Sequence, residues 1–407
     1  MTSVQQDPNK NKSNKNKSNK NRNFINSLRN NNNKTLMFEP IANGAFGTVF
    51  HGIPNRENPT KNLKKTVNKV YYKKQTNKTI PAAYKKELAR SEIVKGIIKS
   101  QESIAKKYGT RITKKQLLDH MQNGTRKNAF KNRNTRRNDE IVEMITMPNL
   151  GIDIFELVTQ NYDVFGMIDK IAVEILKLLN VVYEINEGQK VHGDIRPENI
   201  LVSINEESLG NMTIIDFDLF NSKEEILDIK HTLYHTPPEY IVFKYYYDTN
   251  RDVNDKFDRD IFMGMINHMT NNGYEDVINM SGNKENNIMN NVKKSLLEIL
   301  GGDDINFYEL SQLMDSIDLY GLGLSIKILL MKYDKKEHPV IQFIFQKLLP
   351  NIMNGKPNGN YNTNPFKRWS IQEAIDNYTA FLVPYCQTRN ISIPEGYMLY
   401  QNKNIIP

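Results

Sequence analysis

The sequence predicts an α+β protein in which a small strand-rich part precedes a larger helical part. Two short strand-like runs joined by a glycine turn lie within residues 36–52, and further strands are expected at 67–74 and 141–148. A helix is expected between these strands, over 82–107. Beyond Leu150 the apolar residues follow helical spacing, so the order of elements favours two lobes.

The larger part is predicted to contain three well-marked helices and one pair of strands. The helices are expected at 171–185, where the pattern ends at Asn186–Gly188, and at 317–331 and 340–352. The strand pair is expected within 192–216.

Composition favours a soluble protein of a reducing compartment. The apolar share of the 407 residues is 39%, which is enough for a folded body. A single cysteine, Cys386, excludes an intrachain disulfide framework. The N-terminus has no apolar signal region, and no run of 18 uninterrupted apolar residues occurs. We therefore expect a soluble, intracellular and cytoplasmic monomer without a membrane span.

The formal charge of +9 is concentrated in two segments. Residues 1–35, rich in Asn, Lys and Ser, carry eight Lys/Arg against one acid, and residues 101–137 carry eleven against two. We predict that 1–35 is a disordered tail and that about 105–138 is a basic insert. These segments could contact nucleic acid, an anionic membrane or acidic partners, but a solvated surface is the interpretation we favour.

Two loops in the second half of the chain carry oxygen-bearing side chains at a suggestive spacing. The segment HGDIRPENILV (192–202) places Asp194 and Asn199 five residues apart, and Asp216 follows in TIIDFDLF (213–220). Carboxylate and amide oxygens suit Mg²⁺, and phosphoryl transfer also needs an acceptor for the proton of the attacking hydroxyl. An Asp/Asn turn pair that arose by chance is the alternative interpretation.

This pattern, His-x-Asp-x-x-x-x-Asn followed by Asp-Phe-x, resembles the catalytic and metal-binding loops of protein kinases. The resemblance implies a bilobal fold with a small β-rich N-lobe and a larger α-helical C-lobe. It makes Asp194 the catalytic base, with Asn199 and Asp216 as Mg²⁺ ligands. Arg196 stands where serine/threonine kinases carry a lysine, and Pro197-Glu198-Asn199 looks like the serine/threonine form.

The segment IANGAFGTV resembles the kinase glycine-rich loop, in which glycine lets the backbone approach the phosphates of ATP. Ala42 replaces the first glycine of the family pattern. The ATP-binding residues that this resemblance implies are Ile41, Ala42, Asn43, Gly44, Ala45, Phe46, Gly47 and Val49.

A lysine on the third strand should reach the α- and β-phosphates and pair with a glutamate on the following helix. Val70-Tyr71-Tyr72-Lys73 resembles the family pattern, so we assign Lys73, with Lys74 as an alternative. The glutamate is assigned to Glu92, and Glu87 also falls in range. Five residues rotate a helix by about 500°, so both cannot face the same lysine.

The segment MITMPNLG (144–151) resembles the hinge between kinase lobes, with Met147 as gatekeeper. Pro148 lacks an N–H but keeps its carbonyl, and the N–H of Leu150 would be the donor to adenine. Leu201 would form the floor beneath the adenine.

Three later motifs follow in the order found in protein kinases. Thr-Pro-Pro-Glu (236–239) resembles the end of the activation segment, and Asp-Leu-Tyr-Gly-Leu-Gly (318–323) resembles the start of the central C-lobe helix. Asn-Pro-Phe-Lys-Arg (364–368) resembles the late arginine motif, so Arg368 would pair with Glu239. The resemblance covers about residues 38–380.

Three departures from the family pattern have consequences. Gly193 replaces the arginine that usually binds an activation-loop phosphate, which argues against control by phosphorylation of that loop. Asp218 replaces a glycine, so unusual backbone angles are expected there, with a magnesium loop that flips less readily. Residues 240–314 form an insert, acidic and helical in part, that is either a partner platform or an inert elaboration.

The predicted domains are a tail, an N-lobe over 36–147, a C-lobe over 148–384 and an extension over 385–407. Transfer of the γ-phosphate of ATP to Ser/Thr of a protein substrate is the function that the resemblance implies. The alternatives are a small-molecule phosphotransferase of the aminoglycoside or choline kinase type, which the His-Gly-Asp form also resembles, and a pseudokinase scaffold. The Asn/Lys-rich composition resembles that of kinases of giant nucleocytoplasmic DNA viruses (mimivirus-like), a bias shared by amoebae and some parasites.

Overall fold

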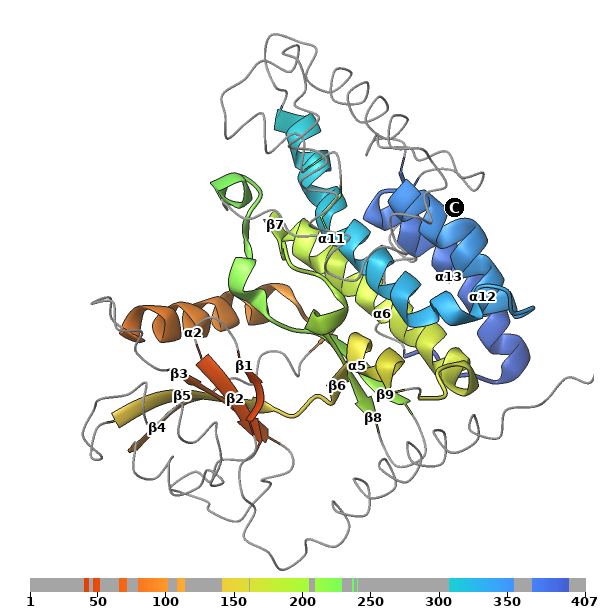
Figure 1. Cartoon of the computed structure of the whole chain (residues 1–407). Helices are drawn as coiled ribbons and strands as arrows, with labels where there is room; N and C mark the ends of the chain where they lie inside the picture. The colour runs from red at the N-terminus through yellow and green to blue at the C-terminus, as the bar shows by residue number, and fades with distance from the viewer. Residues whose placement is uncertain are drawn as a thin grey trace, which may run out of the picture. The chain divides into compact units, whose positions relative to one another are not determined.

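A computed structural model describes about half of the chain, and its strands and helices are labelled in Figure 1. The described residues are 40–43, 47–51, 66–71, 80–101, 108–113, 141–160, 162–204, 209–228, 236–237, 240, 307–354 and 368–394. The predicted tail at 1–35 lies outside them, as do most of the basic insert and residues 241–306 of the later insert.

The chain divides into two compact units, and its content is mixed, mostly helical, with small sheets. Unit 1 comprises residues 1–80 and 110–146, and unit 2 comprises 81–109 and 147–407. The helix that follows the third strand belongs to unit 2, apart from its first residue. None of the helices in the described ranges is long and apolar enough to cross a membrane.

Unit 1 is built on a five-stranded sheet with the order β1-β2-β3-β5-β4. Its strands are β1 (Pro40–Asn43), β2 (Gly47–His51), β3 (Thr66–Tyr71), β4 (Tyr108–Thr113) and β5 (Ile141–Pro148). β2 pairs antiparallel with both β1 and β3.

Two of these strands differ from the sequence prediction. β3 ends at Tyr71, three residues earlier than predicted. β4 lies inside the segment predicted to be a basic insert. In its sequence, YGTRIT, the residues Tyr, Thr and Ile alternate with Gly, Arg and Thr, a strand signal that the surrounding lysines obscured. β5 has the predicted bounds.

Helix α2 (Ile80–Ile97) ends ten residues before the predicted end. The chain after α2 is bound by the carboxylate of Glu184, which accepts hydrogen bonds from the backbone N–H groups of Lys99 (3.0 Å) and Ser100 (3.2 Å). The Ser100 hydroxyl donates to the same oxygen at 2.8 Å. A tertiary contact from a distant helix therefore accompanies the end of α2, and the local sequence does not reveal it.

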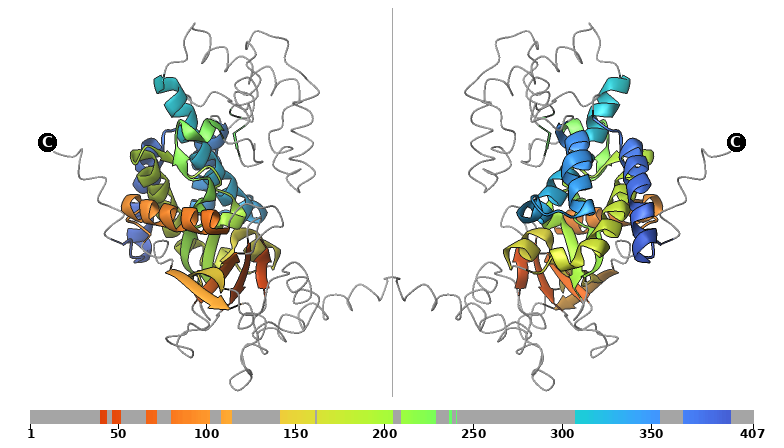
Figure 2. Two further views of the ribbon diagram at one scale, coloured as in Figure 1. Left: turned by 90° about the vertical axis from the view of Figure 1, so that its left-hand side faces the viewer. Right: turned by 90° about the vertical axis from the view of Figure 1, so that its right-hand side faces the viewer.

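Three long helices, α6 (Ile168–Glu187), α11 (Phe307–Leu330) and α13 (Ile371–Arg389), form the body of unit 2. α6 lies beside both α11 and α13 in Figures 1 and 2. It is buried on nearly every side, which explains its continuous apolar sequence. α13 begins with a capping box in which the Ser370 hydroxyl accepts from the N–H of Glu373.

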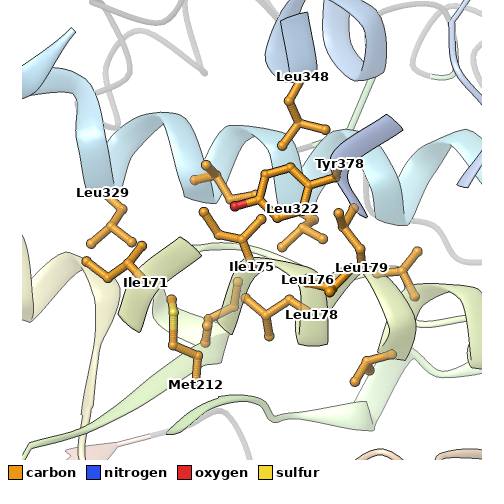
Figure 3. Close-up of a cluster of buried hydrophobic side chains, with 14 of the residues drawn as sticks. Ile171, Ile175, Leu176, Leu178, Leu179, Met212, Leu322, Leu329, Leu348 and Tyr378 are labelled. Atoms are coloured by element: carbon orange, nitrogen blue, oxygen red, sulfur yellow. The ribbon is translucent and has the colours of Figure 1, made fainter. Parts of the chain in front are cut away.

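The core of unit 2 forms where these helices meet (Figure 3). The Tyr378 ring of α13 is fully buried there, and its hydroxyl donates to the carbonyl of Ala172 in α6 at 2.9 Å. This hydrogen bond satisfies the polar end of an otherwise apolar side chain. The labelled leucine and isoleucine side chains of α6 belong to the same buried cluster as this ring.

The helices at 317–331 and 340–352 also differ from their predicted bounds. α11 begins ten residues earlier than predicted, so the predicted insert at 240–314 overlaps its first turns. α12 (Pro339–Phe343) gives way to wider π-type turns at Ile344–Leu348 and Pro350–Asn354. Pro350 has no N–H for a regular helix, which is a sufficient reason for the irregular path there.

Two small sheets complete unit 2. β6 (Ile152–Asp153), β8 (Ile200–Ile204) and β9 (Leu209–Ile214) form one sheet, and β7 (Lys190–Val191) pairs antiparallel with β10 (Asn221–Ser222) in the other. The predicted strand pair is therefore β8 and β9, which pair antiparallel.

The outer edge of β9 is covered by side chains. The N–H of Met212 donates to the buried carboxylate of Glu174 at 2.7 Å, and the N–H of Ile214 donates to Gln101 at 3.2 Å. These bonds satisfy edge groups that would otherwise require another strand.

Candidate active site

The candidate site is formed by the loop at 192–199, which follows β7, and it is attached to helix α11. The carboxylate of Asp318 accepts hydrogen bonds from the N–H of His192 at 2.6 Å and from the N–H of Gly193 at 2.9 Å. Asp318 is fully buried, and burial raises its pKa to about 7 although the two N–H donors lower it. Helix α11 therefore fixes the start of the loop through the buried carboxylate of Asp318.

Gly193 occupies a conformation that side chains disfavour. Its φ is +75°, and a Cβ built on it would lie 2.7 Å from the Cδ1 atom of Ile226. Glycine adopts positive φ with little penalty, whereas an arginine here would be strained. A residue with a side chain at position 193 would therefore need a strained backbone and a shift of Ile226.

Asp194 is held by two neighbours in the same loop. The Asn199 amide nitrogen donates to Asp194 Oδ2 at 2.9 Å and to the Asp194 carbonyl at 2.8 Å. Arg196 Nε lies 3.4 Å from Asp194 Oδ1 in an ion pair. The loop therefore fixes the orientation of this carboxylate.

The environment of Asp194 opposes its ionisation. Its side chain is 13% exposed, and burial raises the pKa of this carboxyl to about 7. The charge of Arg196 lowers the pKa, and the nearby charge of Asp216 raises it. The Asp194 carboxyl can therefore bind and release a proton near neutral pH.

Hydrogen bonds connect this loop to the residue before Asp216. The N–H of Ile215 donates to the carbonyl of Asn199 at 2.8 Å, and the carbonyl of Ile215 lies 3.1 Å from His192 Nε2. His192 is completely buried, and burial lowers its pKa to about 4, so the ring is neutral at pH 7. The structure thus brings Asp194, Asn199 and Asp216 together.

Asp216 itself has a left-handed backbone, with φ 64° and ψ 67°. The unusual backbone angles were predicted at Asp218, and this prediction was wrong. Among the described non-glycine residues only Gln189, Asp216 and Asn390 have positive φ. Asp218 lies in a short 3₁₀ turn, Phe217–Leu219, and its carbonyl accepts a hydrogen bond from Arg90 of α2. Backbone strain at an aspartate next to a candidate base is typical of a functional position.

The donor set of this loop suits a hard divalent cation. The nitrogen of the Asn199 amide is engaged with Asp194, so a metal contact from Asn199 would use Oδ1. A cation here would also relieve the repulsion between Asp194 and Asp216. Within the described ranges no group of three or more His, Cys, Asp or Glu could hold a metal ion. A pair of protein ligands completed by water and substrate phosphates is a usual arrangement for Mg²⁺.

The other predicted ATP-site residues are distributed over both units, and only some are described. Gly44, Ala45, Phe46 and Lys73 lie outside the described residues, as does Lys74. Ile41, Ala42 and Asn43 belong to β1, and Gly47 and Val49 belong to β2. Met147 and Pro148 end β5, the half-buried Leu150 follows two residues later, and Leu201 lies in β8.

The two candidate glutamates lie on different faces of α2. Glu87 is buried, at 7% exposure, whereas Glu92 is exposed to solvent. Five residues rotate a helix by about 500°, so the two side chains do not share a face. Burial of a carboxylate requires a partner, so Glu87 is the stronger candidate for an ion pair.

The predicted ion pair of Arg368 with Glu239 cannot be followed, since Glu239 lies outside the described residues. Arg368 is buried, and its guanidinium carbon lies 5.4 Å from the centre of the Tyr320 ring in α11. The late arginine therefore contacts the same helix that supports the candidate site.

The sequence alone did not predict that Asp318, which stands in the motif at 318–323, accepts hydrogen bonds from backbone N–H groups. A buried aspartate in an apolar helix was the available signal. No known family model matches this chain, and no curated protein matches it either.

Proposed function

We propose that this chain is a protein kinase of the serine/threonine type, which transfers the γ-phosphate of ATP to a protein hydroxyl. Its fold would be the bilobal one, with unit 1 as the strand-rich lobe and unit 2 as the helical lobe. The observation that carries the proposal is the position of Asp194, whose pKa is raised to about 7 beside Asn199 and Asp216. A base with a pKa near the working pH removes a proton efficiently.

In the proposed reaction, Asp194 orients the substrate hydroxyl and takes its proton. The hydroxyl oxygen forms a bond to the γ-phosphorus, the bond from that phosphorus to the β,γ-bridging oxygen breaks, and ADP leaves with the electron pair. Arg196, beside Asp194, would face the transferred phosphate oxygens with its planar fork. Asn199 and Asp216 would hold Mg²⁺, which when bound neutralises developing phosphate charge.

The proposal includes Lys73 for the α- and β-phosphates, with Glu92 or the buried Glu87 of α2 as its acidic partner. The proposal extends to the glycine-rich segment at 41–49 for the phosphates and to Met147, Pro148, Leu150 and Leu201 for the adenine. The partners would be a protein substrate and, through the basic tail, acidic partners or nucleic acid.

Radiolabelled γ-phosphate transfer tests this function. Casein, myelin basic protein and kanamycin are offered side by side, with phosphoamino-acid analysis of the products and Asp194→Ala as the matched control. We expect label on Ser/Thr of protein, and a loss of rate in Asp194→Ala on the order of 10²–10⁴. Label on kanamycin alone would indicate a small-molecule phosphotransferase, and binding of ATP without transfer would indicate a scaffold.

A further inference from the structure

The segment that follows Asp216 is attached to the rest of unit 2 at several points. We call residues 219–226 the anchored segment. Asn221 and Ser222 pair with Val191 and Lys190 across the β10–β7 ladder. The N–H of Ser222 donates to Glu225 at 3.2 Å, and the N–H of Glu225 donates back to the Ser222 hydroxyl at 3.2 Å. The segment is thus folded on itself and paired to the strand that precedes the Asp194 loop.

An ion pair between a buried lysine and a partly exposed aspartate attaches the anchored segment to helix α11. Lys223 Nζ lies 2.7 Å from Asp315 Oδ1, and the Lys223 side chain is 7% exposed. Lysine is almost never fully buried without a partner, so this contact explains how Lys223 is accommodated. Asp315 is 33% exposed, and burial raises its pKa while Lys223 lowers it.

The far end of the anchored segment packs against the Asp194 loop. The Cδ1 atom of Ile226 occupies the space beside Gly193 that a Cβ would need. The Tyr240 hydroxyl also donates to the Ile226 carbonyl at 3.4 Å. The absence of a side chain at position 193 is therefore what permits this contact.

Helix α11 supports both parts through carboxylates three residues apart. Asp318 accepts from the N–H groups of His192 and Gly193, and Asp315 pairs with Lys223. Residues three apart lie on one face of a helix, so one rigid surface fixes the Asp194 loop and the anchored segment together.

We propose that Lys223 and Asp315 are positioning residues that hold the anchored segment in its working position, so that turnover requires no phosphate on this chain. The inference rests on the proposed kinase function. Both charges of the contact come from the chain itself, and Gly193 offers no cation to a phosphate.

Kinetics of variants test this inference. Lys223→Met leaves Asp315 without its cation, and we expect kcat to fall roughly tenfold, the change that 1.36 kcal/mol in the barrier produces, with KM for ATP within about twofold. Lys223→Arg keeps the charge and should restore most of the rate. Lys335→Met, at an exposed lysine outside the site, is the matched control and should leave the rate unchanged.

Hydrogen exchange of the full-length protein gives a readout that does not depend on activity. Amides of 219–226 should exchange roughly tenfold faster in Lys223→Met than in the parent or in Lys335→Met. If the parent transfers no phosphate, the proposed function fails, and the exchange result still decides the anchoring.

Phosphatase treatment of the parent protein tests whether turnover requires a phosphate on the chain. We expect the treated parent to retain its rate within about twofold. Loss of activity on dephosphorylation would overturn the inference, as would unchanged kcat and unchanged exchange in Lys223→Met.

Discussion

Asp169, in the first turn of α6, and Asp194, in the loop after β7, lie in different surroundings. Asp169 accepts from Arg389 Nη1 at 2.9 Å on both oxygens and from the Tyr385 hydroxyl. The carboxylate of Asp194 accepts from the Asn199 amide and lies 3.4 Å from Arg196 Nε. One carboxylate is well paired at a partly exposed position, and the other is mostly buried beside a like charge.

The difference follows from what surrounds each group. Asp169 is 40% exposed and also lies at a helix N-terminus, where the backbone dipole favours a negative charge. Asp194 is 13% exposed, and Asp216 raises its pKa further. Structural carboxylates are stabilised as anions, whereas a base must keep a usable affinity for a proton. The comparison thus distinguishes an anchor from a candidate catalytic group.

Among the substitutions that test this comparison, Asp194→Asn is expected to change the free energy of unfolding most. The pKa of Asp194 is raised on folding from 3.8 to about 7, so its ionisation destabilises the fold progressively as the pH rises between these values. Asparagine removes this penalty, and we expect the variant to be more stable than the parent by about 1–3 kcal/mol at pH 8. Urea unfolding at pH 4 and pH 8 measures the difference in unfolding free energy between the variant and the parent. We expect this difference to vanish near pH 4.

Asp169→Asn is the matched control for that experiment. A partly exposed ion pair contributes little, so we expect a loss below about 1 kcal/mol and an unchanged transfer rate. A stability gain in Asp169→Asn, or a loss in Asp194→Asn at pH 8, would contradict the distinction between the two carboxylates.

A smaller effect is expected at Asp216, whose left-handed backbone strains any residue with a Cβ. Asp216→Ala should be less stable than Asp216→Gly by about 1 kcal/mol, because glycine tolerates positive φ. Both variants should lose magnesium-dependent transfer. Equal unfolding free energies for the two variants would show that the strain is absent in solution.

Strong periodic segments could be predicted from the sequence, and tertiary effects could not. The apolar run of α6 and the strand β5 were found because burial dictates their residue types. The end of α2 was missed because a carboxylate from Glu184 accompanies it. β4 was missed because charged neighbours hid its alternation.

At the candidate site, the functional residues could be predicted from the sequence, but their backbone conformations could not. Asp194, Asn199 and Asp216 were selected by spacing and by resemblance, and they lie together in unit 2. Positive φ was assigned to Asp218 when it belongs to Asp216, since family patterns carry no dihedral angles. The pairing of Lys223 with Asp315 joins residues far apart in the chain, and neither stands in a motif.

The pH dependence of kcat tests the central claim most directly. With Asp194 as a base of pKa about 7, kcat for a protein substrate at saturating Mg·ATP should fall about tenfold per pH unit below that value. Bound Mg²⁺ would move the midpoint lower without removing the slope. A rate that stays constant from pH 5 to pH 8, in protein shown to be folded throughout, would contradict the assignment of Asp194.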